Sequence, residues 1–140
     1  MHNLHHRPLK TVHPFLSKHY RYAVVGASRN PAKFGYIVFF DLLHANFAVT
    51  PVNPKLKELG GVKAVARLQD LRPRPDVAVV IVRPEAGLTV LDDAVAAGMK
   101  KLWFQPGAES AEIREKAGKL GLEIVADGSC IMVARRLFNL

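Results

Sequence analysis

Short apolar runs alternate with longer amphipathic stretches along the chain, and this alternation predicts strands and helices in turn. The runs 22–26 and 47–52 are mainly apolar, which is typical of strands that are buried on both faces. Between them, residues 34–46 place apolar side chains three and four positions apart, which predicts a helix packed on a sheet. The segment 51–54 contains two prolines, so we expect the second strand to end there in a turn.

The strongest strand signal lies in residues 76–82, where five of seven side chains are β-branched, so we expect a central strand. Residues 59–65, before this strand, predict only a small excursion of the chain. Pro84 suits the first turn of the next helix because proline has no N–H to leave unpaired, and Gly98 marks where that helix stops. Three more blocks complete the pattern: a strand at 101–105, a helix at 110–120 and a strand at 121–126.

This order of elements predicts the fold class. Strands that are separated by helical segments favour right-handed crossovers and parallel pairing. We therefore expect an α/β, single-domain, Rossmann-like, doubly wound fold, with a mostly parallel five-stranded sheet and helices on both faces. The domain is placed at residues 15–140 and opens with a short helix at 15–19. Residues 1–14 are predicted to be a flexible, basic and His-rich lead-in.

The charge of the chain is asymmetric. Its formal net charge is +8, and residues 1–40 carry six basic and no acidic side chains. A basic front suits any polyanion, including a phosphorylated cofactor, but no recognisable DNA-binding motif is present, so nucleic acid is disfavoured as a ligand. The irregular spacing of the early histidines predicts no metal site. The sequence leaves open whether the chain binds a protein partner or forms a homo-oligomer.

Cysteine usage and the length of the apolar runs bear on location. Cys130 is the single cysteine, which excludes an intrachain disulfide and favours a cytoplasmic protein. No run approaches the roughly 20 apolar residues of a membrane helix, so we expect no association with a membrane. Candidate ligand-binding residues are expected in the loops of the predicted fold.

Ligands of an open parallel sheet bind at the carboxyl ends of its strands, so the loops after the strands are the candidate sites. Four loops qualify: 26–35, 51–55, 82–84 and 105–107. The first begins with Gly26 and reaches Gly35 as a helix opens, so its amides and the helix N-terminus suit a diphosphate. It also carries Arg29 and Lys33. It is not the dinucleotide fingerprint G-x-G-x-x-G, because Ser28 stands where the second glycine belongs.

The second loop narrows the choice of nucleotide. It contains Asn53 and Lys55, so no acidic residue is present to bind a plain ribose as in NAD sites. A neutral or basic group suits a ribose that bears an extra phosphate, as in NADP and coenzyme A. Two hypotheses follow: a coenzyme A site, or the site of an NADP-binding reductase or redox sensor. A third interpretation needs no ligand: the glycines and prolines of these loops would only form the turns.

Several short motifs, taken in their order along the chain, resemble one known family. They are VVGAS at 24–28, PVNP at 51–54, VRP at 82–84, LWFQPG at 102–107 and VADGSCIMV at 125–133. This series resembles the stand-alone CoA-binding domain family, which is similar to the N-terminal CoA-binding domain of the succinyl-CoA synthetase α subunit. The resemblance extends from about residue 15 to the C-terminus.

The resemblance implies coenzyme A or an acyl-CoA as ligand. The first loop would hold the phosphates, the second would approach the adenosine end, the third would flank the adenine or pantetheine, and the fourth would line the pantetheine path. The implied cofactor-binding residues are Gly26, Ala27, Ser28, Arg29, Lys33, Phe34, Gly35, Asn53, Pro54, Lys55, Val82, Arg83, Pro84, Gln105, Pro106 and Gly107.

Cys130 follows the last predicted strand and is a candidate partner of the cofactor thiol, by a mixed disulfide or by accepting an acyl group. The alternative, which we favour, is a partly buried thiol that only packs. No Ser-His-Asp set and no pair of carboxylates is brought together by the sequence. The phosphorylated histidine of the synthetase belongs to a second domain. We therefore expect a non-catalytic binding, carrier or sensor module, not an enzyme, with no catalytic residue.

Overall fold

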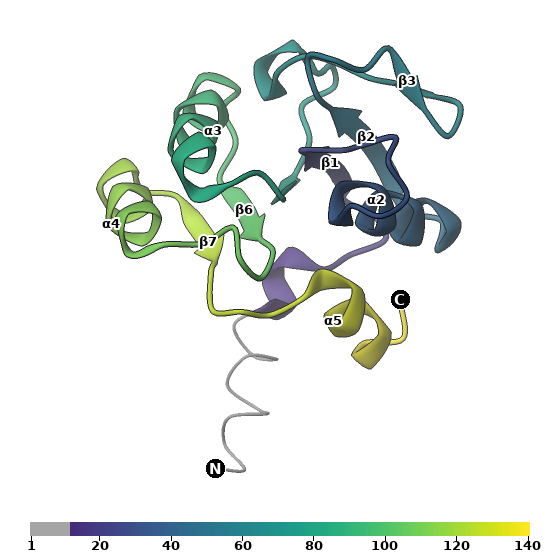
Figure 1. The fold of residues 1–140 in the computed structure, drawn as a ribbon. Coiled ribbons are helices and arrows are strands. Elements are labelled where there is room, and N and C mark those ends of the chain that lie inside the picture. The colour runs from purple at the N-terminus through teal and green to yellow at the C-terminus, as the bar shows by residue number, and fades with distance from the viewer. Residues whose placement is uncertain (1–11) are drawn as a thin grey trace.

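The computed structural model describes residues 12–140 as one central sheet with helices on both sides (Figure 1). All pairs of neighbouring strands in the sheet are parallel, in the order β2-β1-β5-β6-β7. The strands are β1 (Arg21–Val25), β2 (Ala48–Val52), β5 (Val77–Val80), β6 (Lys101–Phe104) and β7 (Glu123–Val125). The predicted five-stranded Rossmann-like fold is confirmed, and the strand with the strongest signal, β5, is the central one.

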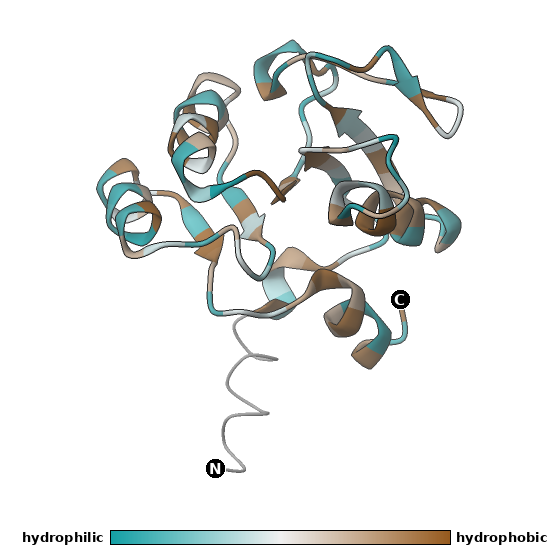
Figure 2. Cartoon of the chain, in the orientation of Figure 1, coloured by the Kyte–Doolittle hydropathy of each residue, from teal (hydrophilic) through white to brown (hydrophobic). Residues whose placement is uncertain are grey.

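Within residues 12–140, the sheet is covered by two helices on each face. They are α2 (Phe34–His44), α3 (Pro84–Ala96), α4 (Ala111–Leu120) and α5 (Ile131–Leu137). One core cluster joins the sheet to α2 and α5, and a second joins it to α3 and α4. The two helix pairs lie on opposite sides of the sheet in Figure 1, and α2 is largely apolar in Figure 2.

The alternation of side chains along β5 explains how both cores form from one strand. Val77 and Val79 belong to the cluster under α2 and α5, whereas Ala78 and Val80 belong to the cluster under α3 and α4. Because successive side chains point to opposite faces, a strand between two helix layers must be apolar at every position. All four residues are buried, as the continuous apolar run predicts.

The second strand ends within residues 51–54 as predicted, because β2 stops at Val52 and a turn follows. Pro51 itself remains in β2, in register with Val24 of β1. The reason is that β2 is an edge strand, where the missing N–H of a proline removes no bond of the sheet. The carbonyl of Pro51 faces the outer side, where it accepts a hydrogen bond from the Val65 N–H at 3.2 Å.

The connections differ in detail from the sequence prediction. The excursion after β2 is a small hairpin of β3 (Glu58–Leu59) and β4 (Val62–Lys63), followed by a 3₁₀ turn at Leu68–Asp70. The chain after β7 forms α5, which no periodicity had predicted. Its seven residues are too few to show a repeating pattern of apolar positions.

The start of the domain also differs. The helix predicted at 15–19 is replaced by a 3₁₀ turn at His13–Phe15, because Pro14 favours the opening of such a turn. The Tyr22 hydroxyl donates a hydrogen bond to the Phe15 carbonyl at 2.7 Å, which fixes this turn on β1. Residues 1–11 of the proposed lead-in lie outside the described residues, and Val12 is buried in the core.

Candidate functional site

The loops after β1, β2, β5 and β6 meet at one edge of the sheet, because parallel strands have their carboxyl ends on the same side. Three cavities lie along this edge, of about 1110, 380 and 140 Å³. The first shares Phe34, Ile81, Val82 and Arg83 with the second, and Gly26 and Val82 with the third. We call this continuous series the groove. It passes the ends of four strands, β2, β1, β5 and β6, which is roughly 14 Å at about 4.8 Å per strand spacing.

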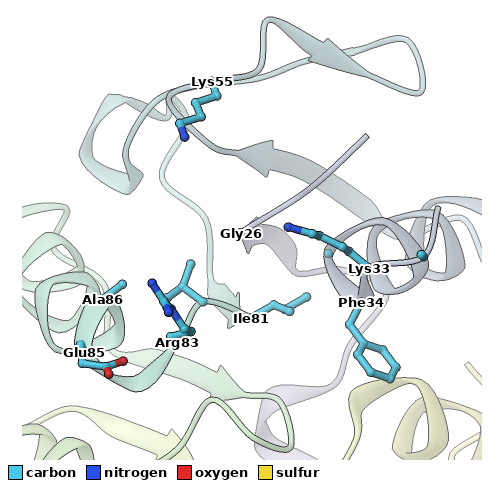
Figure 3. Close-up of a pocket in the computed structure, with 11 residues that line it drawn as sticks. Gly26, Lys33, Phe34, Lys55, Ile81, Arg83, Glu85 and Ala86 are labelled. Carbon is cyan, nitrogen blue, oxygen red and sulfur yellow. The ribbon is translucent and has the colours of Figure 1, made fainter. Parts of the chain in front are cut away.

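The first cavity lies over the ends of β1 and β5 (Figure 3). Cationic side chains reach it from three segments: Lys33 before α2, Lys55 after β2 and Arg83 before α3. All three are exposed, and among residues 12–140 no ion pair or side-chain hydrogen bond engages their charged groups. Glu85 also lines the cavity. The cavity therefore carries a net positive charge that is available to an anion.

Two glycines allow the first loop to pack against α2. A Cβ atom on Gly35 would lie 2.0 Å from the Gly26 carbonyl oxygen, which is far closer than any real contact. Gly26 itself has φ = 96°, in the region that favours glycine. These glycines therefore bring the N-terminus of α2 directly against the end of β1.

The N-terminus of α2 presents backbone N–H groups to the first cavity. Phe34 and Gly35 are the first two residues of the helix, and their N–H groups have no partner within it. The Tyr36 and Ile37 N–H groups both donate to the Lys33 carbonyl, at 3.0 and 3.1 Å. No acidic residue occupies this first turn. The positive end of the helix macrodipole therefore adds to the charge of the three cations.

Asn53 connects the first two loops. Its side-chain Nδ2 donates to the Ala27 carbonyl at 2.8 Å, and its Oδ1 accepts from the Lys55 N–H at 2.8 Å. Both the nitrogen and the oxygen of this side-chain amide are therefore hydrogen-bonded within the protein. Asn53 shapes the loop that carries Lys55.

The second cavity lies between the end of β6 and the start of α5. Gln105 is 4% exposed, and its Oε1 accepts from the Ile131 N–H at 2.8 Å while its Nε2 lies 3.4 Å from Cys130 Sγ. The Trp103 indole Nε1 donates to the Ser129 carbonyl at 2.9 Å. Trp103 of β6 and Gln105, which directly follows β6, thus hold the segment that leads into α5 against the sheet.

The third cavity is small and lies behind the second loop. The nearly buried Asp93 of α3 pairs there with the Arg67 guanidinium and accepts a hydrogen bond from Gln69 Nε2 at 3.3 Å. The hydrogen bond from Arg67 to this carboxylate raises the pKa of Arg67. This ion pair joins the 3₁₀ turn at Leu68–Asp70 to α3 and closes one end of the groove.

Most of the residues predicted for the site line the groove. These are Gly26, Lys33, Phe34, Gly35, Asn53, Pro54, Lys55, Val82, Arg83, Gln105, Pro106, Gly107 and Cys130. Ala27, Ser28, Arg29 and Pro84 do not line it. Ala27 is buried under the loop, Ser28 accepts a hydrogen bond from the Asn30 N–H, and Pro84 begins α3. Which of these residues contact a ligand stays a prediction.

The groove also contains residues that the sequence analysis did not select. Ile81 is shared by the two larger cavities, and Ala86, Ala108 and the Arg67–Asp93 pair line one cavity each. Ile81 directly precedes the predicted third loop, so a one-residue extension would have found it. The Arg67–Asp93 pair spans 26 positions of the sequence, and no local signal indicates it.

Neither a metal-binding cluster nor a membrane-spanning helix occurs among the described residues. Residues 12–140 hold no group of three or more His, Cys, Asp or Glu side chains arranged to bind a metal ion. The histidines at positions 2, 5 and 6 lie outside this range. None of the described helices has the length and apolar character needed to cross a membrane.

Similar proteins include chains of comparable length. A conserved hypothetical protein from Pyrococcus furiosus has a solved structure with a TM-score of 0.78 and 51% sequence identity, and the match covers 81% of this chain and 97% of that one. The uncharacterized protein YneT of Bacillus subtilis is 30% identical, over 85% of this chain and 87% of YneT. This chain therefore corresponds to nearly the whole of both relatives.

A larger enzyme contains the same domain. Subunit alpha of ADP-forming acetate–CoA ligase II from Pyrococcus furiosus is 29% identical over 84% of this chain, but the match spans only 28% of that subunit. The family model of a CoA binding domain matches residues 20–136, which include every strand and the start of every helix described above. This chain is a member of the CoA-binding domain family.

Proposed function

We propose that this chain binds coenzyme A or an acyl-CoA along the groove. The observation that carries the proposal is the change in character from one cavity to the next. The first cavity offers three unpaired cations and the free N–H groups of α2, whereas the second is smaller and mainly apolar. Coenzyme A has the same arrangement, because its phosphates lie at one end and its uncharged pantetheine arm at the other. Family membership supports the same ligand.

The proposal assigns each part of the ligand to a part of the groove. The diphosphate lies over Gly26 and the N-terminus of α2, near Lys33. The adenosine and its 3′-phosphate lie toward Asn53 and Lys55. The pantetheine arm crosses Val82, and its thiol end reaches the second cavity. Anions bind well at such helix ends because the backbone N–H groups and the macrodipole act together.

We further propose that the chain acts by binding, as a carrier, a sensor or the partner of an acyl-CoA enzyme, and not as a catalyst. The chain spans 28% of the ligase subunit, so the activity of that whole subunit does not transfer to it. A cytoplasmic location remains the expectation for a chain with one cysteine.

Cys130 keeps its role as a candidate thiol partner within this proposal. It lines the second cavity, where the proposed orientation would place the end of the pantetheine arm. Intact-mass spectrometry after incubation with coenzyme A disulfide provides the test, because exchange at Cys130 would add one coenzyme A moiety and release one free coenzyme A thiol. A chain that stays unmodified under these conditions removes the role.

Titration calorimetry with four nucleotides tests the ligand itself. We expect the Kd to be lowest for coenzyme A, higher for dephospho-CoA, which lacks the 3′-phosphate, and much higher for NADPH and NADH. Loss of a charge-assisted hydrogen bond accounts for roughly a tenfold difference between the first two. Tighter binding of NADPH than of coenzyme A would support the reductase or redox-sensor hypothesis and overturn this proposal.

A further inference from the structure

Apart from the Arg83 guanidinium, the polar groups described here at the second cavity have partners inside the protein. Both ends of the Gln105 amide are engaged, by the Ile131 N–H and by Cys130 Sγ. The Gly107 N–H donates to the Glu109 carboxylate at 2.7 Å. An occupant with amide or carboxylate groups would therefore find few free partners there. Burying an unpaired polar group is unfavourable, so the cavity favours a group that needs no hydrogen bonds.

The wall of this cavity also includes an apolar side chain that the protein leaves uncovered. Phe34 is 63% exposed and lines both the first and the second cavity. Its ring points away from the Lys33 ammonium group in Figure 3. A large exposed aromatic at the rim of an apolar cavity is a common feature of binding sites, because a ligand gains free energy by covering it.

We propose that the second cavity receives the acyl group of an acyl-CoA, and that this group is short, uncharged and apolar. The inference rests on the proposed function, since it places the acyl group at the end of the same ligand. The cavity volume of about 380 Å³ lies within the range of about 300 to 1,000 Å³ that is usual for small-molecule sites. The amides of pantetheine then remain in the more open part of the groove near Val82, where water can pair with them.

Arg83 defines the alternative. It is the one charged residue that lines the second cavity, and a carboxylate at the end of the acyl chain could pair with it. However, Arg83 is exposed and also lines the first cavity, where the phosphates are proposed to bind. A charged acyl group would lose its hydration in this cavity, and the other lining residues carry no charge that could pair with it. The apolar acyl group is therefore favoured.

Calorimetric titration with coenzyme A, butyryl-CoA and succinyl-CoA tests the acyl preference. Butyryl and succinyl groups have four carbons each, so they differ mainly in the terminal carboxylate. We expect butyryl-CoA to bind about tenfold more tightly than coenzyme A, because burial of a few methylene groups favours it. We expect succinyl-CoA to bind no more tightly than coenzyme A.

Substitutions at Phe34 identify the wall that produces this preference. Phe34→Ala should reduce the ratio of the two Kd values, coenzyme A over butyryl-CoA, by about threefold or more. Phe34→Leu keeps an apolar wall and should preserve most of the ratio. Leu137→Ala is the matched control, because Leu137 is 60% exposed on α5 and lines none of the three cavities, so the ratio should not change.

The outcomes separate the two proposals. If coenzyme A binds but butyryl-CoA binds no more tightly, or if succinyl-CoA binds most tightly, the acyl inference fails and the proposed function stands. If Phe34→Ala leaves the ratio unchanged, the acyl group lies outside the second cavity and the inference fails as well. If none of the three compounds binds, both proposals fail.

Discussion

The first and second cavities of the groove differ in how the protein uses its polar groups. In the first, the charged groups of Lys33, Lys55 and Arg83 and the N–H groups of Phe34 and Gly35 have no partner in the described chain. In the second, the amide of Gln105 is paired at both of its ends. The first cavity therefore offers several unpaired charges, whereas the second shares only Arg83 with it and is otherwise mainly apolar, with the Gln105 amide already paired.

This difference indicates which of the two cavities would attract the ligand and which would determine specificity. Exposed cations cost little to leave unpaired, because water solvates them, and they attract phosphates over a distance. Buried amides must be paired within the fold before any ligand arrives. The first cavity is thus suited to attract an anion, and the second to select among uncharged ends of the ligand. Four experiments test this contrast, and the first should have the strongest effect.

Gly35→Ala should disrupt the first cavity most strongly. The new methyl group would lie 2.0 Å from the Gly26 carbonyl oxygen, so either α2 or the end of β1 must shift. We expect the free energy of unfolding, measured by urea denaturation, to fall by about 3 kcal/mol. Gly118→Ala is the control, because its Cβ would meet no atom within 4 Å and alanine favours helices. Equal effects of the two substitutions would contradict the close approach.

Removal of the cations should weaken binding without disturbing the fold. Lys33→Ala and Lys55→Ala should each raise the Kd of coenzyme A about tenfold, and the double variant about a hundredfold. The dependence of the Kd on salt should decrease at the same time. Lys57 and Lys119 are exposed lysines that line none of the three cavities, so the double alanine variant at those positions controls for net charge. Similar losses in both double variants would show that only overall charge matters.

Gln105→Leu should affect the second cavity by loosening α5. The Ile131 N–H would lose its acceptor, and we expect the free energy of unfolding to fall by about 1 to 2 kcal/mol. Hydrogen exchange of the α5 amides provides a local measurement. Gln69→Leu is a useful comparison, because Gln69 Oε1 is buried and has no hydrogen-bond partner among the described residues. We expect this substitution to lower the free energy of unfolding less than Gln105→Leu does. A larger effect at Gln69 would argue against a structural role for Gln105.

A change far from both cavities should leave the contrast intact. Burial is the main cause that raises the pKa of Tyr22 from 10.0 to about 12. Because the folded state keeps the neutral phenol, its contribution to stability is complete below pH 10 and is lost as the pH rises to about 12. At pH 11 we expect a loss of about 1 kcal/mol relative to pH 9.

The same experiment needs two variants. Tyr22→Phe should be less stable at pH 9, because it loses the hydrogen bond to the Phe15 carbonyl, but its stability should fall less between pH 9 and pH 11. Tyr36→Phe retains the Tyr22 phenol and should behave like the unmodified chain. If Tyr22→Phe shows the full decrease, another group is responsible for it.

Much of the fold and of the first cavity could be predicted from the sequence. The apolar run of β5 indicated a central strand, and the two glycines of the first loop indicated a strand-to-helix loop whose amides suit a phosphate. These are local signals, since burial on both faces and the need for glycine each act on neighbouring residues. The sequence did not indicate that the strand containing Pro51 lies at the edge of the sheet, which is the position where a proline is tolerated.

The sequence by itself determined which elements form, in what order, and which end of the sheet carries free cations. Only the tertiary structure decided that the Gln105 amide is used up by the start of α5, and that Asn53 ties the first two loops together. The physical reason is that strand and helix signals depend on spacing along the chain. The pairing of a buried polar group depends instead on partners about 26 residues away, which only the folded chain brings within hydrogen-bond distance.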